Sequence, residues 1–127
     1  QALARTLATV LKERRALIVA SSDLSHYPRY EEAVRVDRAV LSAVLSLEPA
    51  TLQASIDKYM REGIDELHTC MCGEGPVTAT MLYAREIGAT QVDVIHYANS
   101  GDVPYGSRHQ VVGYGAVRFA FAHPGGE

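Results

Sequence analysis

A short, continuous apolar run at residues 16–20 constrains the fold of this chain more than any other feature. Five apolar residues are too few for a buried helix, and such a run is typical of a strand that is covered on both faces. The run passes directly into the polar segment 21–27, and Pro28 then disfavours helix at the preceding residue and opens a helix after it. The sequence therefore predicts a buried strand, a polar loop and a helix, the unit from which α/β folds are built.

Helical and strand patterns alternate along the rest of the chain. In the helical stretches apolar residues recur at intervals of three and four, and glycine or proline stands at several of their ends. Alternation in one strand segment sets Val92, Val94 and His96 on one face and Tyr97 on the other. The patterns predict helices at residues 2–14, 29–47, 49–62 and 77–87, and strands at residues 91–97 and 109–121. The expected fold class is α/β.

Length and composition limit the classes of function. A chain of 127 residues, 47% of them hydrophobic, builds one domain or part of one. The net charge of -3 comes without a stripe of Lys and Arg, so we expect no nucleic-acid partner. The longest apolar stretches are well short of the roughly 20 residues that cross a bilayer, so we expect no membrane partner.

The cysteines indicate a cellular compartment, and the first residues indicate that the chain is part of a longer protein. The two cysteines stand one residue apart, which is unlike a disulfide framework and favours reduced thiols in a cytoplasmic setting. The sequence begins inside a helical pattern without a methionine. We therefore expect a fragment of a longer protein.

Asp23 and His26 are the leading candidates for chemistry. They lie three apart in the polar loop that follows the predicted strand, and ligands of open α/β sheets bind beyond the carboxyl ends of strands. His26 would act as a general acid or base, and Asp23 would orient it. The alternative is a structural turn in which both residues only form hydrogen bonds. A hydrolytic triad with Ser22 or Ser25 is disfavoured, because residues so close in sequence rarely reach the required geometry.

Cys72 is a candidate metal ligand. It precedes a glycine and a helix that begins near a proline, and a helix N-terminus favours the thiolate, the form that binds metal. The alternative is a buried, inert cysteine. Cys70 and Cys72 are too close for the CxxC spacing, and the sequence holds no second pair, so a four-cysteine zinc site is not expected.

Other polar residues are weaker candidates. Glu74 lies close to Cys72 and could act as a second ligand or a base, although a charged residue in a glycine-rich loop is more often solvated. Among the remaining histidines, His96 is the one that could reach a site. Residues 98–108 form a long polar loop suited to the rim of a pocket, or an ordinary exposed connection. The residues without an assigned role are His68, His109, His123, Ser100, Asp102 and Tyr105.

Four segments in this order and spacing resemble the MEMO family, which is related to the class III non-haem iron extradiol dioxygenases. The resemblance runs from about residue 16 to residue 121, nearly the whole chain. The segments are IVASSDLSHY at residues 18–27, CGEGP at 72–76, YANSGD at 97–102 and VVGYGA at 111–116.

The resemblance implies a mixed β-sheet flanked by helices, with residues 1–127 forming the C-terminal part of a single domain. In the family pattern a metal is held by two histidines and a third protein ligand, and the cysteine motif assigns that third ligand to Cys72. The SSDLSH motif resembles the dioxygenase segment that carries the acid–base histidine, which implies this role for His26 with Asp23 beside it. The two ligand histidines belong to an N-terminal half that this chain lacks, and this missing half is the expected partner.

The resemblance also implies a function. We expect a metal-dependent redox or oxygen-activating protein with iron(II), or another divalent metal, and an oxidoreductase activity like that of the non-haem iron dioxygenases. A thiolate in place of the dioxygenase carboxylate makes the metal environment softer. The alternative is a non-catalytic protein that uses the same pocket to bind a small molecule, a peptide or a partner protein. A third hypothesis is that this segment folds only together with its missing half.

Overall fold

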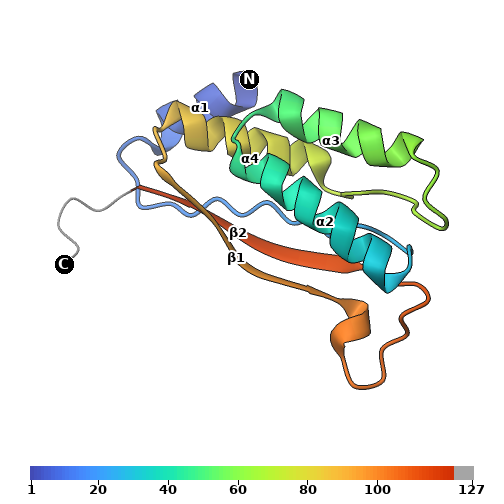
Figure 1. Cartoon of the computed structure of the whole chain (residues 1–127). Helices are drawn as coiled ribbons and strands as arrows, with labels where there is room; N and C mark the ends of the chain where they lie inside the picture. The colour runs from blue at the N-terminus through green and yellow to red at the C-terminus, as the bar shows by residue number, and fades with distance from the viewer. Residues whose placement is uncertain (122–127) are drawn as a thin grey trace.

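The computed structural model describes residues 1–121 and has the α/β composition expected from the sequence. The four helices of this region carry most of the core, and two strands follow them near the end of the chain (Figure 1). A short 3-10 helix, η1, comes directly after the first strand. The elements are α1 (Ala2–Leu11), α2 (Tyr30–Leu45), α3 (Pro49–Arg61), α4 (Glu74–Glu86), β1 (Gln91–Asn99), η1 (Ser100–Asp102) and β2 (Gly113–Ala120).

Prolines and glycines mark the helix ends much as expected. Pro49 is the first residue of α3, and Gly63 follows the end of that helix with φ +74. Gly88 follows α4 with φ +75, a conformation that costs other residues strain. Helix α4 begins at Glu74, three residues earlier than predicted, because a proline is tolerated in the first turn, where its missing N–H has no partner to lose.

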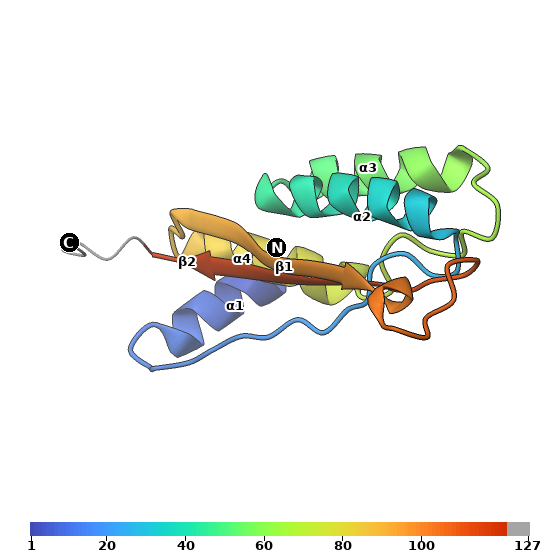
Figure 2. The same ribbon diagram turned by 60° about the horizontal axis from the view of Figure 1, so that its bottom comes forward.

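The core lies between α2, α3 and the two strands. The predicted apolar face of α2 is buried, and this helix packs against α3 and against both strands, whereas α1 packs against α4. Figure 2 shows α2 and α3 together over one face of the strand pair. The buried residues of α2 are Ala33, Val36, Asp37, Val40, Leu41, Ala43 and Val44.

The described residues contain a two-stranded antiparallel sheet with an irregular register. Strands β1 and β2 pair along their length, but the register shifts between Val94 and His96, so that Ile95 has no partner. Such a bulge moves the following side chains to the opposite face. The expected placement of His96 on the face of Val94 is therefore wrong: His96 is exposed, whereas Tyr97 packs against the core.

The prediction of a buried strand at residues 16–20 is also wrong for this structure. The segment is extended, and within residues 1–121 the backbone of residues 16–21 forms no hydrogen bond with another backbone group. Leu17 is 89% exposed and Val19 is 76% exposed. The strand-like conformation is present, but no strand of residues 1–121 pairs with it, and only Ile18 and Ala20 are partly buried.

In the described part of the chain, the helices are all too short or too polar to span a bilayer. His123, one of the histidines without an assigned role, lies outside the described residues.

Candidate metal centre

The two polar loops identified in the sequence lie side by side. The backbone N–H of His26 donates to the carbonyl of Thr69 at 3.0 Å, and the N–H of His68 donates back to the carbonyl of His26 at 3.1 Å. A little further along, the N–H of Cys72 donates to the carbonyl of Asp23 at 3.3 Å. These backbone bonds join the loop at residues 21–27 to the segment that leads into α4.

Gly73 allows this close approach. A Cβ at this position would stand 2.6 Å from the carbonyl oxygen of Ser21 and 2.6 Å from the Cβ of Ser22. The glycine N–H donates instead to the hydroxyl of Ser22 at 2.8 Å, and that hydroxyl donates to the carbonyl of Asp23 at 2.7 Å. A larger residue at Gly73 would force the two loops apart and move Cys72 away from Asp23.

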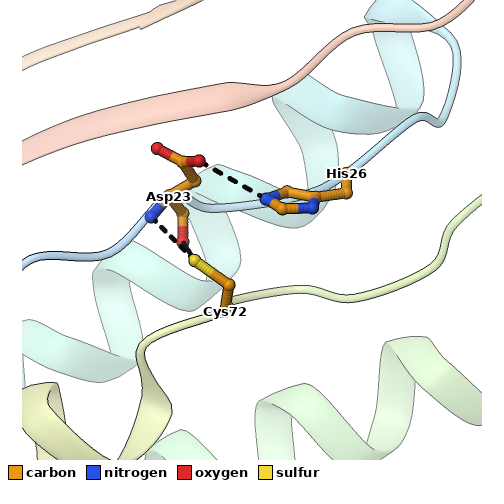
Figure 3. A group of neighbouring side chains, drawn as sticks. All are labelled: Asp23, His26 and Cys72. Carbon is orange, nitrogen blue, oxygen red and sulfur yellow. Dashed lines mark hydrogen bonds and ion pairs between the residues drawn. The ribbon is translucent and has the colours of Figure 1, made fainter.

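Asp23, His26 and Cys72 converge on one point, as Figure 3 shows. Each offers one ligand atom, and these atoms lie within 4.8 Å of one another. The nearest carboxylate oxygen of Asp23 is 3.6 Å from Nε2 of His26, and the backbone N–H of Asp23 donates to Sγ of Cys72 at 3.2 Å. The sequence thus identified three residues that the fold brings together.

The burial of these groups differs in a way that suits a site at a surface. Cys72 is exposed, whereas Asp23 and His26 are partly buried. Nε2 of His26 is itself buried, and it has no hydrogen-bond partner in the structure. A buried polar atom without a partner costs free energy. The sulfur of Cys72, the imidazole nitrogen of His26 and the carboxylate oxygen of Asp23 are all donor types that bind divalent transition metals.

A buried carboxylate beneath the site was not among the sequence candidates. Asp37 is fully buried in α2, where its Oδ1 accepts the backbone N–H of Ser25 at 2.8 Å and its Oδ2 accepts the hydroxyl of Tyr97 at 2.8 Å. Burial raises the pKa of Asp37, and the hydrogen bonds from Ser25 and Tyr97 offset only part of this rise. Burial and the Asp37 carboxylate raise the pKa of Tyr97. The signal was present, because Asp37 occupies a core-facing position four residues after Ala33.

The structure does not bring the weaker candidates into this group. Cys70 is buried, its Sγ lies 3.9 Å from the carbonyl oxygen of Ile56, and burial raises the pKa of its thiol to about 11. Glu74 is the first residue of α4, and His96 is exposed on β1. Neither belongs to the cluster formed by Asp23, His26 and Cys72.

The long loop after β1 forms a separate polar contact. Asn99 caps η1, and Asp102 accepts the hydroxyl of Tyr30 at 2.6 Å and the backbone N–H of Asn99 at 2.8 Å. The hydroxyl of Tyr30 and the N–H of Asn99 lower the pKa of Asp102. Arg108 stacks over the ring of Tyr30 at 4.2 Å. These contacts tie the loop to the start of α2, so they do not supply a ligand to the cluster.

Comparison with known proteins identifies the family. The family model described as Memo-like protein matches residues 1–118. A MEMO1 family protein of Methanothermobacter thermautotrophicus is 38% identical over 110 residues, which are 85% of this chain and 36% of the relative. A MEMO1 family protein of Archaeoglobus fulgidus is 37% identical over 106 residues, covering 84% of this chain and 36% of the relative.

A third relative shows a similar extent of alignment. The MEMO1 family protein of Ignicoccus hospitalis is 35% identical over 123 residues, which are 92% of this chain and 40% of the relative. Across these three relatives the aligned region amounts to 36% to 40% of the curated protein. Since the family model covers nearly the whole chain, this chain belongs to the family of Memo-like proteins.

Proposed function

We propose that this chain contributes one side of a metal-dependent redox site, with Cys72 as the ligand that it supplies to an iron(II) ion. The observation that carries the proposal is the convergence of Cys72, Asp23 and His26, whose ligand atoms lie within 4.8 Å of one another. The Cys72 thiol is exposed, and its sulfur accepts the backbone N–H of Asp23. Bound iron would supply Lewis acidity and one-electron chemistry.

His26 is the residue that would move a proton. Its Nε2 is buried and has no hydrogen-bond partner, so a substrate group that reaches this nitrogen would exchange a proton with it. Asp23 lies 3.6 Å from this nitrogen, close enough to orient the ring. The side chain of His26 is 22% exposed, although its Nε2 is buried.

The rest of the metal shell would come from the remainder of a longer domain. The relatives are more than twice as long as the matched region, and one thiolate does not complete the shell of a transition metal. The extended segment 16–21 leads directly into the candidate site, and its backbone forms no hydrogen bond with another backbone group of the described region. We infer that a strand from the remainder of the domain pairs here, covers Leu17 and Val19, and extends the sheet to the mixed sheet of a dioxygenase-like fold.

The thiol chemistry agrees with a reducing compartment. Both cysteines are free in the structure, and the exposed one occupies the candidate site. An exposed thiol in an oxidising compartment is readily oxidised or capped, which would remove the ligand. We therefore place this function in the cytoplasm.

Metal affinity tests the proposal. The longest polypeptide that carries this chain is loaded anaerobically with Fe(II). The dissociation constant for Fe(II) is then compared between this protein and its Cys72→Ala variant. We expect a loss of affinity of at least ~10-fold, because removal of a thiolate ligand removes one metal bond. Cys70→Ala is the matched control, since this buried sulfur lies outside the cluster, and its affinity should stay within ~3-fold of the original.

Two outcomes separate the proposal from its alternative. Unchanged Fe(II) affinity in Cys72→Ala would falsify the assignment of the ligand. Intact, cysteine-dependent metal binding without oxygen consumption across a panel of catechols would instead favour a non-catalytic protein that binds a small molecule, a peptide or a partner protein in this pocket.

A further inference from the structure

Asp37 is a carboxylate in an apolar core. It is 0% exposed on the face of α2 that packs against the strands, among valine, leucine and alanine side chains. Both of its bonded partners, the N–H of Ser25 and the hydroxyl of Tyr97, are neutral donors. A buried carboxylate without a cationic partner reduces the stability of a fold unless its hydrogen bonds compensate. The packing of α2 alone therefore gives no reason for this residue.

The donor that Asp37 holds lies inside the candidate site loop. Ser25 stands between Asp23 and His26, and its N–H points down to Oδ1 of Asp37. The carbonyl of Ser25 accepts the N–H of Gly113, and the carbonyl of Gly113 accepts the N–H of Leu24. The loop is thus fixed from beneath by a side chain and from one edge by the start of β2.

Tyr97 fixes the carboxylate itself. The bulge in β1 between Val94 and His96 turns the Tyr97 side chain toward α2, where its hydroxyl reaches Oδ2 of Asp37 at 2.8 Å. Without the bulge, alternation would put this side chain on the opposite face. A carboxylate accepts from both donors at once and has no donor of its own. Asparagine would instead place an NH2 donor against one of them.

We propose that Asp37 is a positioning residue whose carboxylate fixes the peptide N–H of Ser25, and thereby holds Asp23 and His26 on the side of the loop that faces Cys72. The proposal deepens the proposed function, on which its metal-binding consequence rests. A structural consequence follows that needs no metal. Loss of the Asp37 carboxylate should loosen the backbone of residues 23–26 more than it loosens the rest of the molecule.

Backbone hydrogen exchange, followed by NMR, tests this claim. Exchange is measured in the unsubstituted chain and in three variants, Asp37→Ala, Asp37→Asn and the matched control Asp57→Asn, which makes the same change on the partly exposed surface of α3. In Asp37→Ala we expect the amides of Ser25 and His26 to exchange at least ~10-fold faster relative to the amides of α3. In Asp37→Asn we expect at least ~3-fold, because a neutral oxygen is a weaker acceptor than a carboxylate.

The outcomes distinguish a local from a global role. If exchange in the loop and in α3 accelerates by the same factor, Asp37 acts through overall stability and the proposal is wrong. If neither variant changes exchange in the loop, it is also wrong. Should Asp37→Ala fail to fold, Asp37→Asn decides, since it conserves volume. Asp57→Asn should leave the loop amides unchanged.

A Co(II) titration of the longest polypeptide that carries this chain adds the consequence for the site, because the rest of the metal shell is proposed to come from that polypeptide. In folded Asp37→Ala we expect Co(II) to bind at least ~10-fold more weakly, which a purely structural role would not cause once the protein is folded. If the unsubstituted chain binds Co(II) without a thiolate band, the proposed function fails, whereas the exchange result still decides the role of Asp37. An unchanged Co(II) affinity beside faster loop exchange would overturn the link between the loop and the metal.

Discussion

Gly113→Ala is the change for which the structure predicts the largest effect on the site from a single methyl group. A Cβ on Gly113 would stand 1.9 Å from Oδ2 and 2.6 Å from Cγ of Asp37. Ordinary contact begins at 3.4 Å, so the carboxylate must retreat by roughly 1.5 Å. The 2.8 Å bonds from Ser25 and Tyr97 cannot survive a retreat of that size.

The expected cost follows from these contacts. Each hydrogen bond to a charged group contributes about 1.5–3 kcal/mol, and overpacking of a core costs about 1–3 kcal/mol. Allowing for partial relaxation, we expect Gly113→Ala to lower the free energy of unfolding by about 3–5 kcal/mol. Gly75→Ala is the matched control, because nothing lies within 4 Å of its added Cβ, and in helix α4 it should be neutral or stabilising by up to ~1 kcal/mol.

Urea unfolding followed by circular dichroism measures both effects, and a double-mutant cycle identifies their cause. In an Asp37→Ala background the methyl group of Gly113→Ala has room, so its cost should fall below ~1.5 kcal/mol. A cost below ~1 kcal/mol in the original chain, or an equal cost in both backgrounds, would show that Gly113 and Asp37 do not restrict each other.

Three further predictions concern the exposed segment, the thiols and the buried carboxylate. Replacing Leu17 and Val19 by serine should change the free energy of unfolding of this chain by less than ~0.5 kcal/mol, because both side chains are exposed. The same change should destabilise a longer polypeptide that covers these side chains by about 1.5–3 kcal/mol for each residue. Equal small effects in both proteins would contradict the proposed strand pairing. Iodoacetamide at pH 8 should label Cys72 and spare Cys70 in the folded protein, as mass spectrometry would show, because Cys70 is buried and its thiol pKa is raised to about 11; rapid labelling of Cys70 would contradict this burial. Because the folded pKa of Asp37 is raised above its ordinary value of 3.8, its contribution to stability is fully present below that value and is lost as pH rises through the folded pKa. Relative to Asp37→Asn, the original chain should therefore gain stability as pH falls from neutral toward 3.8 in urea titrations, and an unchanged difference would refute the raised pKa.

The helices and the site loop could be predicted because their signals are local. Proline and glycine set the ends of α3, and the apolar spacing of α2 matched the face that is buried. The convergence of His26 and Cys72 was predicted through the resemblance to a family, because spacing within one sequence does not define contacts between residues 46 positions apart. The structure provides that contact through backbone bonds between the two loops.

The errors arise where tertiary context overrides local pattern. Residues 16–20 have the composition of a buried strand, yet a buried strand requires neighbouring strands, and none of the described residues pairs with this run or covers Leu17 and Val19. The bulge at Ile95 inverted the expected faces of His96 and Tyr97, and a single extra residue leaves no mark in an alternating pattern. Asp37 was missed because the apolar face of this helix was defined by its apolar residues alone, although the position of Asp37 four residues after Ala33 lies on that face.

The proposed function requires Cys72 to be a metal ligand beside Asp23 and His26. X-ray absorption at the zinc edge, with zinc as a redox-silent probe in the longest polypeptide that carries this chain, measures this directly. We predict a sulfur shell at about 2.3 Å that disappears in Cys72→Ala and persists in Cys70→Ala. A spectrum with nitrogen and oxygen neighbours alone, or a sulfur shell that survives Cys72→Ala, would contradict the account.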